Sequence, residues 1–250
     1  MSAKAIKRLK DYQLKKFDKK SLIGEKWQHI RSLIDKNFPS GRFSFVDLGG
    51  GNGLFADRIF DHYPQAKGLV LDNSQTLLKL NKLHHNKTII YDSAENIDQI
   101  LNGQQIDIIF MHFVLHHFVT DNYLGTREMQ RNIISNAANI LSAGGFIGIF
   151  ESIYNGRFID NLPGWLIYNL TSSKAISFLI RLAGANTAGC GVCFLSKKEW
   201  DKEILSSGCE VVDYSKFNVR MFRNRLYTIM VRTILHISSS YQGYFCVKKK

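Results

Sequence analysis

The stretch Phe45-Val-Asp-Leu-Gly-Gly-Gly-Asn-Gly53 decides the fold of this chain. It has the pattern of a buried strand that runs into glycines at 49, 51 and 53, with a helical pattern from Leu54 onward. Glycine lets the backbone approach a ligand without a Cβ clash, and a helix N-terminus offers free N–H groups. The dinucleotide fingerprint does not fit, because it needs a small residue where Leu54 stands. Asp47, the acid before the first glycine, favours a ligand that carries positive charge instead.

Short apolar runs and helical stretches alternate outward from this motif. Strands are expected over residues 43–48, 68–71, 88–91, 106–111 and 146–150, with helices between them near 54–62, 74–83, 95–101 and 127–141. This alternation is typical of a parallel, doubly wound sheet with right-handed crossovers. Two later runs, 209–217 and 243–247, predict two more strands. We therefore expect an α/β fold with a Rossmann-like, doubly wound, mostly parallel seven-stranded sheet.

With these elements in this order, the sequence resembles the class I S-adenosylmethionine-dependent methyltransferases. The first motif of that family is an acid followed by G-x-G-x-G after the first strand, and here it is matched by Asp47, Gly49, Gly51 and Gly53. The resemblance covers roughly residues 43–151 and implies S-adenosyl-L-methionine as the cofactor.

Three further positions match the family after the later strands. Asp72 ends the second strand, where the resemblance implies a carboxylate that accepts the ribose hydroxyls. Asp92 follows the third strand, where an acid takes the adenine amino group and the backbone N–H of Ser93 meets a ring nitrogen. His112 ends the fourth strand and is expected to line the methionine portion. Any of these acids alone could equally serve a turn or a helix cap, but their order along the chain favours the cofactor site.

The segment Met111-His-Phe-Val-Leu-His-His-Phe118 holds the candidate general bases. Histidine titrates near neutral pH, which suits removal of a proton from a hydroxyl acceptor. His116 and His117 are therefore the catalytic candidates, and many small-molecule members of the family carry a similar L-H-H. The alternative is that these histidines only hold the pocket by hydrogen bonds. Glu151, at the end of the fifth strand, could bind substrate or anchor a loop.

Residues 1–40 are expected to form N-terminal helices, over 3–18 and 24–37, ahead of a methyltransferase domain over 41–250. Two inserted stretches, at about 155–195 and 219–240, are expected to form a helical cap or lid. One helical face of the second stretch is apolar and consists of Val219, Phe222, Leu226, Ile229, Met230 and Ile234. We expect this face to pack over the active site and exclude water. The same helix could instead lie on an anionic membrane surface.

The net charge of +12 is concentrated at the two ends of the chain. Residues 1–27 hold nine lysines and arginines against three acids, and residues 215–250 hold eight and none. Such ends are solvated faces, or they meet an acidic substrate, a nucleic acid or a membrane. After the fourth strand, His112-Phe-Val-Leu replaces the D/N-P-P-Y-type motif of nucleic-acid amino methyltransferases. A small-molecule acceptor is therefore favoured over a nucleic acid.

The four cysteines are irregularly spaced, which favours a reducing cytoplasm over a disulfide framework. Cys190-x-x-Cys193 has neither a second pair nor a nearby histidine, so no metal site is expected. The N-terminus lacks the apolar segment of a secretory signal.

Together these features predict transfer of a methyl group from S-adenosylmethionine to a small, partly apolar acceptor in secondary or cofactor metabolism. One alternative is an RNA methyltransferase that uses the basic ends for phosphate contacts. The other is a non-catalytic protein that only binds S-adenosylmethionine. The acceptor, its reacting atom and the oligomeric state stay open.

Overall fold

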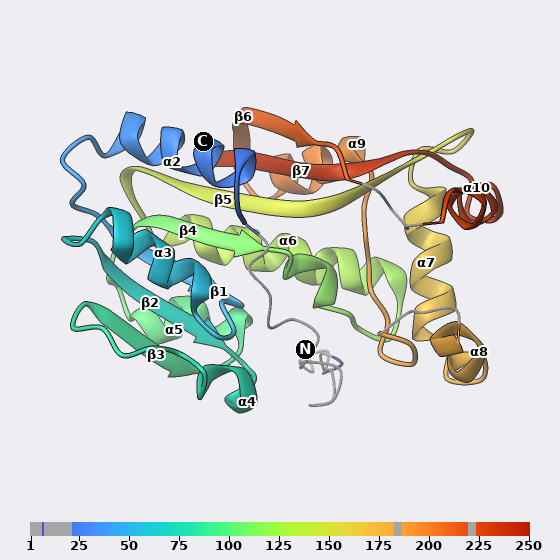
Figure 1. Cartoon of the computed structure of the whole chain (residues 1–250), viewed down its shortest axis with the longest axis horizontal. Coiled ribbons are helices and arrows are strands. Elements are labelled where there is room, and N and C mark those ends of the chain that lie inside the picture. Colours follow the sequence, from blue (N-terminus) through green and yellow to red (C-terminus); the bar gives the residue numbers. More distant parts are fainter. Residues whose placement is uncertain (1–6, 8–21, 183–186, 220–223) are drawn as a thin grey trace.

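The computed structural model describes residue 7 and residues 22–182, 187–219 and 224–250. Its strands are β1 (Ser44–Leu48), β2 (Lys67–Asp72), β3 (Lys87–Tyr91), β4 (Ile106–His112), β5 (Leu141–Gly156), β6 (Cys209–Phe217) and β7 (Ile237–Lys249). They form one seven-stranded sheet in the order β3-β2-β1-β4-β5-β7-β6 (Figure 1). Strands β1 to β5 pair in parallel, and β7 runs antiparallel to both of its neighbours. The expected Rossmann-like, mostly parallel seven-stranded sheet is confirmed.

The described helices are α2 (Glu25–Asn37), α3 (Leu54–His62), α4 (Gln75–Leu78), α5 (Ile97–Leu101), α6 (Tyr123–Asn139), α7 (Leu162–Ser172), α8 (Ser177–Leu182), α9 (Lys197–Ser206) and α10 (Arg225–Ile234). Two single turns of 3₁₀ helix, η2 (Ala94–Asn96) and η3 (Leu115–His117), follow β3 and β4. The helix expected over 3–18 lies outside the described residues. The division into 1–40 and 41–250 stays a prediction.

Helices cover both faces of the sheet, as the alternation of its side chains requires. Phe45, Ile108 and Phe110 point into one core, where they pack with the buried faces of α2 and α3. Val46 and Ile109, one position along, belong to the opposite core with α5, α6 and α9. Each central strand is therefore buried on both sides, which fixes its register and the place where it ends.

The central strands end together at one edge of the sheet. Asp47 pairs with Val70 of β2 and with Phe110 of β4, so the carboxyl ends of these three strands lie side by side. Strand order reverses between β1 and β4, because the chain passes from β3 back across the sheet to β4. In open α/β sheets such a switch point is where ligands bind.

The helix expected over 74–83 is much shorter in the structure. Ser74 caps α4 by accepting the Leu77 N–H at 3.2 Å, but the helix ends at Leu78. The Asn81 amide donates to the Leu78 carbonyl at 3.1 Å and to the Gly51 carbonyl at 2.8 Å. A side chain that binds backbone carbonyls in this way competes with the helical pattern. It also ties this loop to the glycine-rich turn.

Strands β5 and β7 are longer than expected and extend beyond the parallel core as a two-stranded ribbon. Their pairing continues from Ile147 opposite Val247 to Gly156 opposite Ile237. The polar run Ser238–Ser240 carries no strand signal of its own, and its backbone pairing with β5 keeps it extended. The ribbon leads into α7 on one strand and receives α10 on the other, at the right-hand end of Figure 1.

The apolar face of α10 does not pack over the site, contrary to expectation. None of its residues is buried, although the helix is amphipathic. Within the described part of 219–240, no residue lines the cavity described below. The periodicity predicted the helix correctly but not its surroundings, because the pairing of β7 with β5 determines where α10 lies. No described helix is both long and apolar enough to cross a membrane.

Candidate active site

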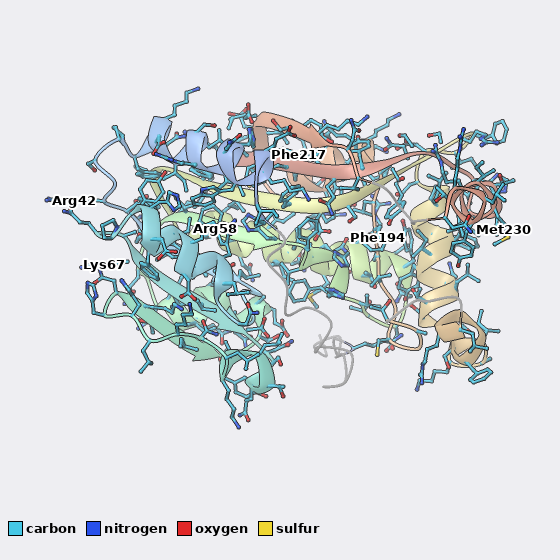
Figure 2. All side chains as sticks on the ribbon, in the orientation of Figure 1. Arg42, Arg58, Lys67, Phe194, Phe217 and Met230 are labelled. Carbon is cyan, nitrogen blue, oxygen red and sulfur yellow. The ribbon has the colours of Figure 1, made fainter. Side chains whose placement is uncertain are left out.

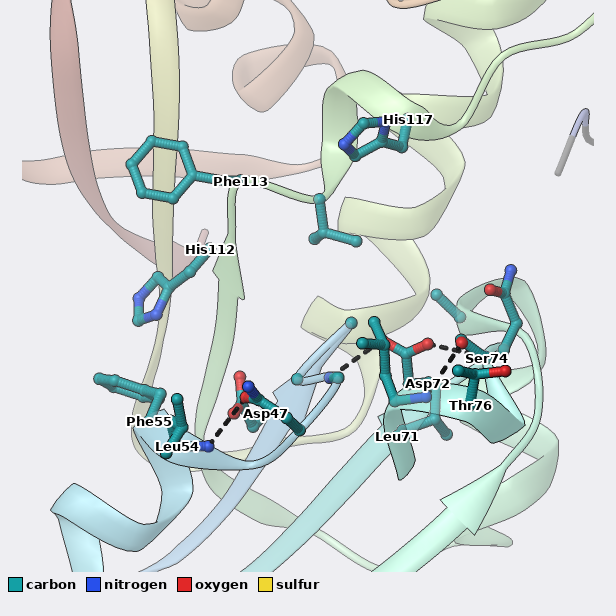
Figure 3. Close-up of a pocket in the computed structure, with 18 of the residues that line it drawn as sticks. Asp47, Leu54, Phe55, Leu71, Asp72, Ser74, Thr76, His112, Phe113 and His117 are labelled. Atoms are coloured by element: carbon teal, nitrogen blue, oxygen red, sulfur yellow. Dashed lines mark hydrogen bonds between the residues drawn. The ribbon is translucent and has the colours of Figure 1, made fainter. Parts of the chain in front are cut away.

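A cavity of 1280 Å³ opens at the carboxyl ends of β1, β2 and β4 (Figure 3). It is lined by eight of the residues expected from the sequence: Asp47, Gly49, Gly51, Asp72, Asp92, His112, His116 and His117. Gly53 and Ser93 lie outside its lining. The acids lie on one side of the cavity, with His112, Phe113 and His117 across from them (Figure 3). The fold thus brings together residues that are up to 70 positions apart in the chain.

The glycine-rich turn comes close to its neighbours in the way only glycine allows. Gly49 has a φ of 73°, and a Cβ there would lie 2.3 Å from Val114 Cγ2. Gly53 has a φ of 71° as the N-cap of α3, and a Cβ there would lie 1.8 Å from Asn81 Oδ1. Gly49 therefore shapes the cavity wall, whereas Gly53 holds the turn against the loop after α4.

Asp72 is held rigidly at the end of β2. Its Oδ2 accepts the Gly51 N–H at 2.9 Å, and its Oδ1 accepts the Ser74 N–H at 2.8 Å. Burial raises the pKa of this carboxyl, and the backbone N–H groups of Ser74, Gly51 and Asn73 oppose that rise. A carboxylate has about four lone-pair sites, so these backbone donors leave room for a ligand. A pair of hydroxyl donors is a suitable partner for such a carboxylate.

Asp47 is almost fully buried beneath the glycine turn. Its Oδ2 has no hydrogen-bond partner among the described residues. Burial raises its pKa to about 7, and the nearby Asp72 adds to that rise while Lys87 opposes it. A buried carboxylate oxygen is normally paired with a cation or a hydrogen-bond donor, and Asp47 Oδ2 is not. The ammonium group of an amino-acid moiety would supply both.

Asp92 and Ser93 follow β3 at the far side of the cavity. Asp92 is half-buried, and its Oδ1 accepts the Ser93 N–H at 2.6 Å and the Asn96 amide at 2.8 Å. Ser93 is buried away from the cavity, and its hydroxyl donates to Glu95. The N–H that the resemblance assigns to an adenine nitrogen therefore bonds to Asp92 in this structure.

His112 stands at the end of β4, with its ring edge-on to Phe55 at 4.5 Å between ring centroids. Neither of its ring nitrogens has a hydrogen-bond partner among the described residues. Burial lowers its pKa to about 3, so the imidazole is neutral at physiological pH. A neutral ring can donate or accept one hydrogen bond to a ligand, but it is a poor proton acceptor.

His116 is held by a buried carboxylate. Its Nδ1 lies 2.6 Å from Glu151 Oε2, and its backbone N–H donates to Glu151 Oε1 at 3.3 Å. Glu151 is completely buried on β5. Phe194 stacks on the imidazole at 4.6 Å, and the His116 carbonyl accepts the Cys193 N–H at 2.9 Å. The hydrogen bond to Glu151 and the stacking of Phe194 therefore fix the imidazole ring at the wall of the cavity.

His117 differs from its neighbour in its environment. Burial lowers the pKa of His117 well below its usual value, and the adjacent His116 adds to that effect. The two rings lie 4.1 Å apart. The structure therefore separates the two catalytic candidates: His116 is paired with the Glu151 carboxylate, whereas burial and its histidine neighbour both disfavour the protonated form of His117.

Several lining residues were missed at the level of the sequence. Phe113 has a φ of 55°, a strained backbone that is uncommon outside glycine, and its ring stacks on Phe150 at 4.8 Å. The others come from α3, β5, the segment before α9 and β7, and they are Phe55, Arg58, Ser152, Phe194 and Gln242. No local motif marks them. Only the strand order brings them to one cavity.

Cys190 and Cys193 lie in the segment before α9. Among the described residues no group of three histidine, cysteine or acidic side chains is placed to hold a metal ion. Burial raises the pKa of Cys193 to about 12, so its thiol stays protonated. Its backbone, rather than its sulfur, contributes to the site through His116.

Residues 46–147 match the model of a family described as "Methyltransferase domain". Over these 102 of its 250 residues, the chain is similar to that family. The match spans β1 to β5 and contains every cofactor residue expected from the sequence. The cofactor of the methyltransferase domain is S-adenosylmethionine. The unpartnered Asp47 carboxyl, the Gly49 turn and the two oxygens of Asp72 fit its amino-acid and ribose portions.

Two curated plant enzymes are similar to this chain. The columbamine O-methyltransferase of Coptis japonica is 23% identical over 172 residues, which cover 69% of this chain and 42% of that enzyme. The flavonoid 8-O-methyltransferase 1 of Ocimum basilicum is 26% identical over 113 residues, 45% of this chain and 29% of that enzyme. The chain thus aligns with less than half the length of either relative.

A solved structure shares the fold. The structure of LepI in complex with S-adenosylmethionine superposes with a TM-score of 0.59 at 12% sequence identity. The match covers 96% of this chain and 51% of that one. At this level of identity the likeness concerns the fold alone.

Proposed function

We propose that this methyltransferase transfers a methyl group from S-adenosylmethionine to a hydroxyl group of a small, partly apolar acceptor in secondary or cofactor metabolism. The observation that carries the proposal is the buried pair of His116 and Glu151 at the wall of the cavity, with 2.6 Å between Nδ1 and Oε2. A hydroxyl is a weak nucleophile and gains from a base, whereas a neutral amine does not need one. Both curated relatives are O-methyltransferases by name, which supports the same choice.

In this pair His116 is the base and Glu151 is the residue that positions it. The Glu151 carboxylate can only accept a hydrogen bond, so the proton of the neutral imidazole sits on Nδ1. Nε2 is then the nitrogen that takes the proton of the acceptor hydroxyl. The cofactor supplies an already activated methyl group, so alignment and proton removal are what the protein must add. Glu151 stays beside the imidazolium that forms and stabilises its charge.

The neighbouring histidines are weaker candidates for this role. Burial holds the pKa of His112 at about 3 and that of His117 well below its usual value. Proton transfer is most effective when the pKa of the base lies near the working pH. We therefore take His116, whose Nδ1 is paired with Glu151, as the base and give His112 a positioning role.

The character of the acceptor follows from the other residues that line the cavity. Three aromatic rings, Phe55, Phe113 and Phe194, line the cavity beside the histidines. Arg58 and Gln242 add polar groups to the lining. Pockets of this kind bind flat, mostly apolar molecules that carry a few polar substituents. A phenolic acceptor meets both requirements.

The experiment measures methyl transfer from S-adenosylmethionine to a panel of simple phenols, catechols, amines and a structured RNA. We expect products from the phenols or catechols. His116→Gln should lower kcat by roughly a hundredfold or more, and Glu151→Gln by a smaller factor, with little change in S-adenosylhomocysteine affinity. His117→Gln is the matched control and should keep most of the turnover.

Three results would contradict the proposal. Methylation of amines or RNA alone would assign another acceptor class. Full turnover by His116→Gln would leave the histidine with a structural role only. Tight S-adenosylmethionine binding without transfer to any hydroxyl compound in a broad panel would favour a non-catalytic binding protein.

A further inference from the structure

Helix α10 exposes its apolar face to solvent. Leu226, Ile229 and Ile234 are 77%, 52% and 61% exposed, and Met230 beside them is also exposed. These four residues stand at positions i, i+3, i+4 and i+8 along the helix, which places them on one face. Large apolar residues that gather on one exposed face mark a site for a partner or a membrane.

The same end of the molecule carries further exposed apolar side chains. Gly156 of β5 pairs with Ile237 of β7, so the turn before α7 adjoins the end of α10. The Arg157 N–H donates to the His236 carbonyl at 2.9 Å, and Phe158, 82% exposed, lies 6.4 Å from the His236 ring. Figure 2 shows this end at the right, with Met230 labelled on α10.

Helices α7 and α8 extend this surface. Their exposed apolar side chains are Trp165, Phe178 and Leu182. The two helices contact each other, and α7 also packs against β5. We call these residues, with Phe158, Ile159 and the exposed face of α10, the apolar end.

The charges around the apolar end are almost all positive. In the described residues 155–182 and 224–238 the lysines and arginines are Arg157, Lys174, Arg181, Arg225 and Arg232. The acid among them is Asp160, whose carboxylate accepts the Ser196 hydroxyl. Within these described stretches, basic residues therefore outnumber acids by five to one.

We propose that the apolar end binds the surface of an anionic membrane, with α10 lying in the plane of the headgroups. A short amphipathic helix with arginines beside an apolar face is the typical structure for this position. Leu226, Ile229 and Met230 enter the acyl boundary, while Arg225 and Arg232 meet the phosphates. Trp165 lies at the interfacial level, which suits its amphipathic ring. The proposal does not depend on which acceptor the enzyme methylates.

Charge favours this partner over a second copy of the chain. Two copies that met through their apolar ends would bring like charges together, which opposes association. An anionic lipid surface meets the same arginines with opposite charge and needs no shape complementarity.

The test is flotation of the full-length protein with vesicles of pure phosphatidylcholine and with vesicles that contain about a third phosphatidylglycerol. We expect binding to the anionic vesicles, weakening with salt, and little binding to the neutral ones. Fluorescence gives a second readout. Trp27 and Trp200 are buried and Trp165 is 47% exposed, so a blue shift on adding anionic vesicles reports on the apolar end.

The decisive variant is Leu226→Asp/Ile229→Asp, which adds charge to the face without touching the core. We expect it to lose vesicle binding at least tenfold while keeping the thermal stability and S-adenosylhomocysteine affinity of the parent. Leu83→Asp is the matched control, because Leu83 is 95% exposed and lies in the loop after α4, far along the chain from this surface. It should bind vesicles like the parent.

Several results would overturn the proposal. Equal binding of the parent and the double variant would place the contact elsewhere. Equal binding to neutral and anionic vesicles would remove the role of the arginines. Absence of vesicle binding, or a dimer in light scattering that the double variant abolishes, would assign the face to another partner.

Discussion

Among single residues, Asp47 is the one whose charge depends most on the ligand. Its pKa is raised to about 7 by burial, so near neutral pH the free protein holds it partly protonated. A cationic amino group beside the carboxyl favours the ionised form and lowers that pKa, so cofactor binding releases a proton. We therefore predict that S-adenosylhomocysteine affinity rises between about pH 6 and pH 8. Calorimetry across that range measures it, and buffers of different ionisation enthalpy count the protons released.

The control for this prediction is Asp47→Asn, which should bind more weakly and lose the pH dependence. Folding stability should respond in the opposite direction. Because the pKa of Asp47 is higher in the folded protein, its contribution is fully present at low pH and is lost as the pH rises toward about 7. In the absence of ligand, Asp47→Asn should therefore melt higher than the parent at alkaline pH. A lower Tm there, or a flat affinity profile for the parent, would contradict this account.

At the scale of elements, the start of α9 shows how tertiary contacts change a capping pattern that the local sequence specifies. The S-x-x-E pattern from Ser196 to Glu199 is typical of a capping box, and the Ser196 hydroxyl accepts the Glu199 N–H at 3.2 Å. The reciprocal bond is absent among the described groups, because the Ser196 N–H donates to Asn161 at 3.0 Å and Glu199 pairs with Arg127. The sequence pattern therefore identifies the N-cap residue Ser196. It does not show that Arg127, which is distant in the sequence, competes for the Glu199 carboxylate.

This cap leads to a stability prediction. Ser196→Ala should destabilise the protein by about 1 kcal/mol, because it leaves a helix N–H unpaired at a buried position. For a chain of this size the Tm should fall by about 2–4 °C in a thermal melt. Asn224→Ala is the comparison, since Asn224 caps α10 in the same way with 3.1 Å to the Tyr227 N–H. That helix buries no residue, so its cap should hardly affect the Tm, and an equal loss would show that α10 is part of the core.

At the scale of the whole molecule, occupancy of the cofactor site should stabilise the fold. With free S-adenosylhomocysteine at about a hundred times its Kd, the gain is about 2.7 kcal/mol, or a Tm higher by about 5–10 °C. Asp72→Ala should weaken binding by about 2–3 kcal/mol and remove most of that shift at the same ligand concentration. Asp98→Ala, an exposed acid on α5, should keep it. An unchanged shift in Asp72→Ala would mean that Asp72 does not hold the ligand.

The whole molecule also shows where prediction from sequence ends. The strands up to β5 and the edge at which Asp47 and Asp72 meet follow from local periodicity and one glycine motif. Gln242 reaches the cavity only because β7 inserts antiparallel between β5 and β6, a placement that no local pattern encodes. The hydrogen bond from the Lys26 ammonium of α2 to Gln242, at 2.5 Å, depends on the same placement. The periodicity of α10 likewise identified an apolar face but not the surface that it meets.

The long β5–β7 ribbon has a consequence for how an acceptor reaches the site. Glu151, which orients the base, lies opposite Gly243 in this ribbon, and Gly156 at its tip adjoins α10. Five residues of extended strand separate these two points, a path of about 17 Å. A poorly water-soluble acceptor that partitions into lipid would therefore be concentrated at a distance from the base that is shorter than the thickness of the bilayer core. Turnover would then depend on the concentration of acceptor in the lipid phase rather than in bulk water.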